Sequence, residues 1–457
     1  MPRSRPKRRP NIVFIMLDSL RRDHLGCYGN EKVKTPNLDR FASENLVFED
    51  ARIGSFPTNP NRSDLFTGRF TFPWRGWTDL PPGETTVAQL LQRAGYATSI
   101  IVDTPNVGRN RTFWRGFEAW NFVPGQEGSH TSLNRKVKAP YFCDLKKLRY
   151  GPEFCRDHMR KIVQRRFERD EPAAMTVRTA LDWLDLNLDN LPFFLWVDTF
   201  QVHEPWWPPR PFRTMYDPGY EGQEVIAPKY GRHKLLTARE ARHTRALYAG
   251  DVTFTDRWVG ILLDKLRDVG LYDSSVIVIT SDHGHYLGEH TTWGKPQGSL
   301  YGELTRIPLL VHHPDVKAPG RVRGLVQPPD VTAGLVDAAG LKVPEFFHGR
   351  PLWSLPRKKL RKVAVMGRLE GPLNITDGAH KHVLWNRDAG ERRAIRENSL
   401  GWTGKGRDEL YDLRKSPGET KNIISPRRKK AAALARSARS FLAEIGAPEE
   451  FVSRFFA

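Results

Sequence analysis

Four short apolar runs most constrain what this chain can fold into. They lie at residues 11–17, 97–103, 193–200 and 275–282. The runs are rich in β-branched and aromatic residues and show no polar alternation, which is typical of strands covered on both faces. Between them, segments 86–95 and 257–270 have helical spacing of their apolar residues, and each ends in a glycine, a common helix end. This alternation predicts an α/β fold built on a mostly parallel sheet.

Length and charge set the frame around this sheet. A chain of 457 residues is long enough for one large domain with a smaller appended unit. The formal net charge of +20 favours anionic partners such as phosphorylated or sulfated molecules or nucleic acid. Simple solubility explains the charge equally well. The three cysteines, Cys27, Cys143 and Cys155, are too few and too irregularly spaced for a disulfide framework or a cysteine metal site.

The N-terminus imitates a secretory signal, with basic residues before an apolar run. Asp18 ends that run after seven residues, however, and no small-residue cleavage site follows. No stretch approaches the roughly 18 to 20 apolar residues of a membrane span. We therefore expect residues 1–10 to be a basic flexible arm and the protein to be cytoplasmic.

Polar residues close two of the predicted strands. Asp18 follows the first run, and Asp282 and His283 close the last. Ligands of open α/β sheets bind beyond the carboxyl ends of the strands, so these side chains could meet in space. Two carboxylates and an imidazole suit a divalent metal, and the imidazole favours manganese or zinc over calcium. Spacing alone supports equally well a helix cap at Asp18 and a turn at 281–284.

The C-terminal part predicts a small unit of its own. Short runs at 362–369, 381–386 and 408–413 suit a small antiparallel sheet. Segment 427–446 then places Leu434, Ala438, Leu442 and Ile445 on one stripe, which predicts a helix packed by that face. Its basic residues belong to the other face, and membrane or nucleic-acid binding is a minority interpretation of them.

Several segments, in order along the chain, form a recognisable set of motifs. They include NIVFIMLDSLRRDHLGCYG (11–29), TNPNRSDLFTGR (58–69), FFLWVDTFQVHEPWWPP (193–209) and WGKPQGSLYGELTRIPLLV (293–311). This set resembles the motifs of the sulfatase family in the alkaline phosphatase superfamily, and the likeness covers most of the chain. It implies an alkaline-phosphatase-like mixed sheet sandwiched between helices over residues 11–355, and a small α+β subdomain over 356–457. The segment 126–157 resembles no motif of the family.

The resemblance also implies roles for single residues. Asp18, Asp282 and His283 match metal-ligand positions, and Thr58 matches the nucleophile, which also touches the metal. Arg62 matches the arginine that supports the nucleophile. We expect one divalent ion, manganese or zinc in preference to calcium.

Two further positions, His203 and Lys295, match residues that contact the substrate. Asp198 and His203 together could hold a second metal ion, but the sequence offers no evident third ligand for it. His203 or His290 could protonate the leaving oxygen, because imidazole titrates near neutrality.

Thr58 departs from the family pattern. The motif C/S-x-P-x-R begins with a residue that is oxidised to formylglycine, and a threonine cannot form that aldehyde. An ester on threonine must be cleared by water, as in the threonine-dependent phosphodiesterases of the superfamily, which favours phosphorus over sulfur. Ser19 replaces a second acid, and segment 100–108 lacks the Gly-Lys-x-His of sulfatases. The set therefore resembles the phosphonate monoester hydrolase and phosphodiesterase branch, or the lipoteichoic acid synthase type.

Three functions remain open. The first is a metal-dependent phosphoester hydrolase, the second is a sulfatase that uses Thr58, and the third is an inactive relative that binds anions or nucleic acid. Thr58 could also merely cap a helix over 61–68. Trp206 and His290 are predicted to touch the substrate, which we expect to be an anionic small-molecule or glycan ester. The sequence gives no oligomeric state.

Overall fold

The computed structural model describes residues 9–126, 144–162, 165–316, 318–353, 361–387, 402–403 and 406–456. Most of the predicted basic arm, most of the segment 126–157 and the predicted domain boundary near residue 355 lie outside these ranges. In the described part, no helix is long and apolar enough to cross a membrane.

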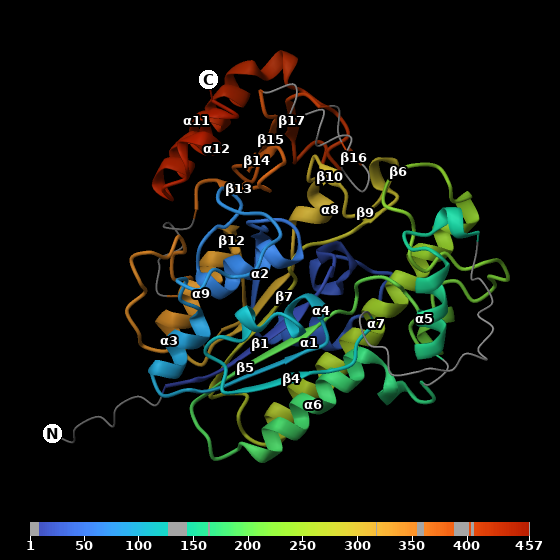
Figure 1. Cartoon of the computed structure of the whole chain (residues 1–457), viewed down its shortest axis with the longest axis vertical. Helices are drawn as coiled ribbons and strands as arrows, with labels where there is room; N and C mark the ends of the chain where they lie inside the picture. Colours follow the sequence, from blue (N-terminus) through green and yellow to red (C-terminus); the bar gives the residue numbers. More distant parts are fainter. Residues whose placement is uncertain are drawn as a thin grey trace.

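An eight-stranded sheet forms the centre of the molecule (Figure 1). The four predicted strands are all present, and they lie side by side as β7, β1, β5 and β3. These four strands pair in parallel, whereas β11 runs antiparallel to β7 and β2. The sheet is therefore mixed, as the resemblance implied. In sheet order its strands are β12 (Gly320–Val326), β2 (Leu46–Ala51), β11 (Leu309–His312), β7 (Ser275–Thr280), β1 (Asn11–Leu17), β5 (Phe193–Thr199), β3 (Ala97–Val102) and β4 (Ala119–Phe122).

Helices cover both faces of this sheet (Figure 1). In β1, Phe14 packs with the core that includes α2 (Thr58–Thr67), α3 (Val87–Arg93) and α9 (Pro328–Ala338). Its neighbour Ile15 packs with the opposite core, which includes α1 (Pro36–Glu44), α6 (Pro172–Leu186) and α7 (Ala238–Asp268). Successive residues of a strand point to opposite faces, so continuous apolarity in β1 reflects burial on both sides.

The second predicted helix is longer than its sequence pattern indicated. It was expected over 257–270, but α7 begins at Ala238. Thr237 caps it, because the Thr237 hydroxyl accepts from the Glu240 amide and the Glu240 carboxylate accepts from the Thr237 amide. This reciprocal capping box fixes a helix start. At its other end Gly270 has φ +70°, a conformation that favours glycine.

The C-terminal subdomain confirms the predicted small antiparallel sheet and helix. The sheet contains β13 (Ala364–Met366), β14 (Leu373–Thr376), β15 (His380–Leu384) and β17 (Glu409–Asp412). The helix α11 (Arg428–Glu444) buries Leu434, Ala438 and Leu442 against this sheet, and Phe70 and Phe72 of the large domain join the same core. The shorter elements are α4 (Pro105–Gly108), α5 (Pro152–Ile162), α8 (Gly302–Thr305), α12 (Glu449–Ser453), β6 (Gly231–Arg232), β8 (Tyr286–Leu287), β9 (Thr292–Gly294), β10 (Gln297–Gly298) and β16 (Trp402–Thr403).

Candidate active site

The predicted metal ligands meet at the carboxyl ends of two neighbouring parallel strands. Asp18 follows β1, and Asp282 and His283 follow β7 closely. One ligand atom from each of the three lies within 4.8 Å of the others, and all three side chains are fully buried. Neither the helix cap nor the simple turn that spacing allowed accounts for this convergence.

The chemistry of this cluster fits a divalent cation. His283 Nδ1 donates to the Gly284 carbonyl oxygen at 2.9 Å, so its Nε2 presents a lone pair to the cluster. Within the described part of the chain, the buried Asp18 Oδ2 has no hydrogen-bond partner. Burial and the nearby Asp282 charge raise the pKa of Asp18 well above its ordinary value. A bound cation would relieve both effects.

Thr58 is the first residue of α2, and its side chain does not cap that helix. Its Oγ1 lies 3.1 Å from His283 Nε2. The alternative that Thr58 merely caps a helix therefore does not hold. Its role as nucleophile stays a prediction, now with a hydroxyl placed at the metal-ligand cluster.

Arg62 lies one turn after Thr58 on the same helix and ties three carboxylates together. Its Nε and Nη2 donate to the two oxygens of Asp198 at 2.8 and 2.7 Å. Its Nη1 donates to Asp282, and Nη2 lies 3.1 Å from Asp18 Oδ2. Because both Asp198 oxygens bind Arg62, that carboxylate is not placed to hold a second metal ion. The guanidinium of Arg62 is thus occupied by contacts with neighbouring carboxylates.

Lys295 reaches the cluster through Ser19, a residue that the sequence marked only as a missing acid. Lys295 Nζ donates to Ser19 Oγ at 3.2 Å, and Ser19 Oγ donates to Asp18 Oδ1 at 2.7 Å. The Ser19 amide donates to Asp282 Oδ1 at 3.0 Å. Ser19 adopts φ +61°, an uncommon conformation for a residue with a side chain. This backbone bend lets one small residue join three site residues.

His203 follows β5 and turns one nitrogen away from its protein partners. Its Nδ1 donates to the Glu204 carbonyl oxygen at 2.6 Å, and its ring stacks on Phe200 at 3.9 Å. Burial, helped by the charges of Lys295 and Arg149, lowers the pKa of His203 well below its ordinary value, against the opposing charge of Glu204.

The two other predicted substrate contacts, Trp206 and His290, pack against protein groups. The Trp206 side chain is fully buried, donates to the Val202 carbonyl oxygen at 2.9 Å and packs edge-on against His285. A buried indole offers no surface to a substrate, so Trp206 supports the site from within. His290 stacks on Tyr301 at 4.0 Å, and its Nε2 lies 3.7 Å from Glu303.

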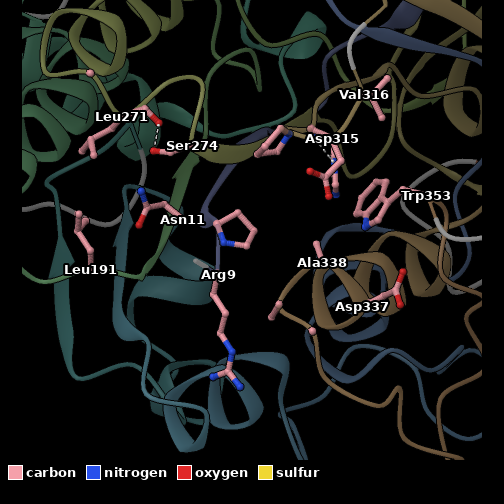
Figure 2. Close-up of a pocket in the computed structure, with 16 residues that line it drawn as sticks. Arg9, Asn11, Leu191, Leu271, Ser274, Asp315, Val316, Asp337, Ala338 and Trp353 are labelled. Carbon is pink, nitrogen blue, oxygen red and sulfur yellow. Dashed lines mark hydrogen bonds between the residues drawn. The ribbon is translucent and has the colours of Figure 1, made fainter. Parts of the chain in front are cut away.

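A separate cavity of about 700 Å³ lies at the other end of the sheet. Asn11 lines it at the start of β1, whereas Asp18 follows the end of that strand. Seven strand residues span about 20 Å, so this cavity is not the metal-ligand site. Figure 2 shows Arg9, Asp315, Asp337 and Trp353 around it.

Comparison with known proteins agrees with the geometry. The sulfatase family model matches residues 10–341. The arylsulfatase of Clostridium perfringens is 25% identical, over 91% of this chain and 90% of that protein. Human iduronate 2-sulfatase is 28% identical, over 69% of this chain and 60% of that protein.

Among solved structures, a phosphonate monoester hydrolase of Agrobacterium radiobacter aligns with a TM-score of 0.72 over 96% of both chains. At 20% identity this likeness shows the fold alone. The match to the family model, by contrast, covers most of the sequence. The chain belongs to the sulfatase family of ester hydrolases.

Proposed function

We propose that this chain hydrolyses phosphoric esters, with phosphodiesters or phosphonate monoesters favoured, through a covalent intermediate on Thr58. The observation that carries the proposal is the position of the Thr58 hydroxyl. Thr58 is the first residue of α2, and its hydroxyl lies 3.1 Å from His283 Nε2, a member of the cluster that contains the buried carboxylates of Asp18 and Asp282.

Threonine chemistry favours phosphorus. Attack by Thr58 Oγ1 on phosphorus forms a threonine ester as the bond to the leaving oxygen breaks. Water can then attack the same phosphorus, and Thr58 departs as a free hydroxyl. A formylglycine hydrate has a second hydroxyl that lets it expel sulfate, and Thr58 has none. The intermediate must therefore be one that water can open.

The residues around Thr58 have separable roles. A divalent ion held by Asp18, Asp282, His283 and Thr58, with manganese or zinc favoured, would supply Lewis acidity and an activated hydroxyl. Arg62 fixes Asp18 and Asp282 in place.

Charge and protons come from other residues of the site. Lys295, beside Ser19, adds a positive charge that favours an anionic substrate. His203 Nδ1 bonds to the Glu204 carbonyl oxygen and Nε2 has no hydrogen-bond partner among the described residues, which supports Nε2 as the nitrogen that gives a proton to the leaving oxygen. His290 is the weaker candidate because its ring packs on Tyr301.

A second candidate function is hydrolysis of a sulfuric ester by Thr58. The observation that favours it is the naming of the relatives, which include an arylsulfatase, an N-acetylglucosamine-6-O-sulfatase and an iduronate 2-sulfatase. A sulfated glycan would also suit the net charge of +20.

One experiment separates the two candidates. Purified protein is stripped of metal, given manganese, zinc or calcium, and assayed on aryl phosphodiester, aryl phosphonate, aryl phosphate and aryl sulfate substrates. We expect turnover of phosphorus esters with manganese or zinc, lost on the order of a thousandfold or more in Thr58→Ala. Thr67→Ala is the matched control, because Thr67 is a buried threonine of the same helix whose hydroxyl, within the described part of the chain, bonds only to the Ser63 carbonyl.

The results lead to different conclusions. Preference for the aryl sulfate would favour the second candidate. Normal turnover by a folded Thr58→Ala protein would remove Thr58 from both mechanisms.

A further inference from the structure

The Glu204 carboxylate lies directly behind His203 and is fully buried. Its Oε1 accepts from Arg149 Nη1 at 2.6 Å and from the Tyr230 hydroxyl. Its Oε2 lies 3.0 Å from His285 Nε2 and 3.3 Å from His203 Nδ1. A buried carboxylate with this many partners is held in one orientation.

Both the backbone carbonyl and the side-chain carboxylate of Glu204 lie near Nδ1 of His203. The His203 Nδ1 proton goes to the Glu204 carbonyl oxygen at 2.6 Å, and the Glu204 carboxylate lies close by at 3.3 Å. The stacked Phe200 ring fixes the plane of the imidazole. One residue therefore sets the tautomer, and Nε2 is the nitrogen left for the substrate.

The charges around His203 oppose one another. Burial disfavours a second proton on the ring, as do the cations Lys295 and Arg149, and together they outweigh Glu204, the anion that favours it. Despite burial, the charges of His203, Lys295 and His285 hold the pKa of Glu204 well below its ordinary value. Glu204 is thus a carboxylate, and it is the group that stabilises a protonated His203.

Arg149 brings the segment 126–157, which sequence motifs left without a role, to the back of the site. Its amide donates to the Ala227 carbonyl oxygen at 2.9 Å, which anchors this part of the chain. Its guanidinium lies over the rings of Tyr230 at 4.1 Å and Tyr150 at 4.7 Å. The Arg149 side chain is 23% exposed, so it extends from the buried Glu204 to the protein surface.

We propose that Glu204 is a positioning residue, which holds His203 with Nε2 toward the leaving group and stabilises its protonated form, and that Arg149 fixes Glu204. This inference rests on the proposed function. Burial disfavours a second proton on His203, so the ring must take up that proton before reaction, and the Glu204 carboxylate stabilises this form. In the first step the leaving oxygen takes this proton from His203 Nε2 as its bond to the transferred group breaks. In the second step Nε2 regains a proton from the attacking water.

The test is the dependence of rate on the leaving group in Glu204→Gln. Loss of proton donation harms a poor leaving group such as phenol far more than an activated one such as 4-nitrophenol. We expect kcat to fall about 100-fold for phenyl esters and much less for 4-nitrophenyl esters, with KM nearly unchanged. The series uses whichever ester class wild-type protein hydrolyses, so the result does not depend on phosphorus or sulfur.

Glu171→Gln is the matched control. Glu171 is also buried and paired with an arginine, Arg165, at 2.7 Å, and nothing places it at the cluster. It should keep the wild-type dependence on the leaving group. A purely structural role for Glu204 would lower the rates of all esters by the same factor, and that result would overturn the proposal.

Two further variants keep the test decisive if Glu204→Gln does not fold. Arg149→Met removes the partner of Glu204 from a partly exposed position and should steepen the leaving-group dependence in the same direction. The double variant Glu204→Gln with Arg149→Met leaves no unpaired charge and should show the full effect. A wild-type dependence in either folded variant contradicts the proposal. Turnover by Thr58→Ala would instead refute the proposed function, so the two failures are distinguishable.

Discussion

Asp198→Asn tests whether the Arg62 network controls metal binding. In the wild-type structure Arg62 donates to Asp198 and Asp282 and lies within ion-pair distance of Asp18. Replacement of Asp198 by asparagine removes the anion that takes two of those donors. The guanidinium charge then acts mainly on the two carboxylates that are predicted to hold the metal.

The chain contains a matched pair for comparison. Asp330 and Arg361 form the same two-point contact, at 2.6 and 2.7 Å, and both are buried away from the cluster. Removal of one partner from a buried ion pair typically costs about 3 to 5 kcal/mol of stability. We expect that loss in Asp330→Asn and a smaller one in Asp198→Asn, because Arg62 keeps two other carboxylates.

Metal affinity should separate the two variants. Changes to residues that position metal ligands typically weaken metal binding about 10- to 100-fold, which is about 1.4 to 2.7 kcal/mol. Calorimetric titration of metal-free protein with manganese and zinc should show this loss in Asp198→Asn only. Thermal unfolding of the same samples reports their stability.

Two results would refute this reasoning. Wild-type metal affinity in Asp198→Asn would show that Arg62 does not compete with the ion. Equal weakening in Asp330→Asn would show that any buried ion-pair loss loosens the site.

Two other predictions concern stability. Chelation should lower the melting temperature, and manganese or zinc should restore it. At a metal concentration one hundred times Kd, binding stabilises the folded protein by about 2.7 kcal/mol. The melting temperature of His283→Ala should respond to neither treatment, and an unresponsive wild type would count against a metal site. Asp64 is fully buried, and burial outweighs its hydrogen bonds from Ser55 and Thr71 and raises its pKa to about 7. The unfolded value is about 3.9, so the folded chain holds the extra proton between these values. Stability should therefore fall by about 3 kcal/mol as pH rises from 4 to 7. Urea unfolding of Asp64→Asn should lack that slope, and parallel curves for the two proteins would contradict the assignment.

Most of the fold could be predicted from local sequence patterns. The apolar runs at β1, β3, β5 and β7 were recognisable because strands buried on both faces need unbroken apolarity. The stripe of α11 was equally legible. The start of α7 was missed because residues 238–256 mix polar and apolar positions, and only the Thr237 capping box marks the true beginning.

The site was predictable where a motif holds several residues together. Thr58 and Arg62 share one segment, and Asp282 and His283 are neighbours. Pairings across the chain were not predictable. Arg62 and Asp198 lie 136 residues apart, and the Arg149 contact with Glu204 depends on a segment without a family motif. A sequence pattern shows which residue types occur, whereas partner choice depends on how strands and loops meet in space.

Thr58 brings these two kinds of information together. Attack on an ester needs a hydroxyl at the cluster, and the first turn of α2 supplies it whether position 58 is threonine or the family's usual residue. The route by which the intermediate is released depends on that side chain, because Lys295 and the ligand set act on the transferred group and Arg62 holds the ligand carboxylates. On the proposed mechanism, the surroundings therefore determine which anions can be attacked. The single hydroxyl of Thr58 then restricts turnover to esters that water can open at the central atom, which is why we place phosphorus ahead of sulfur.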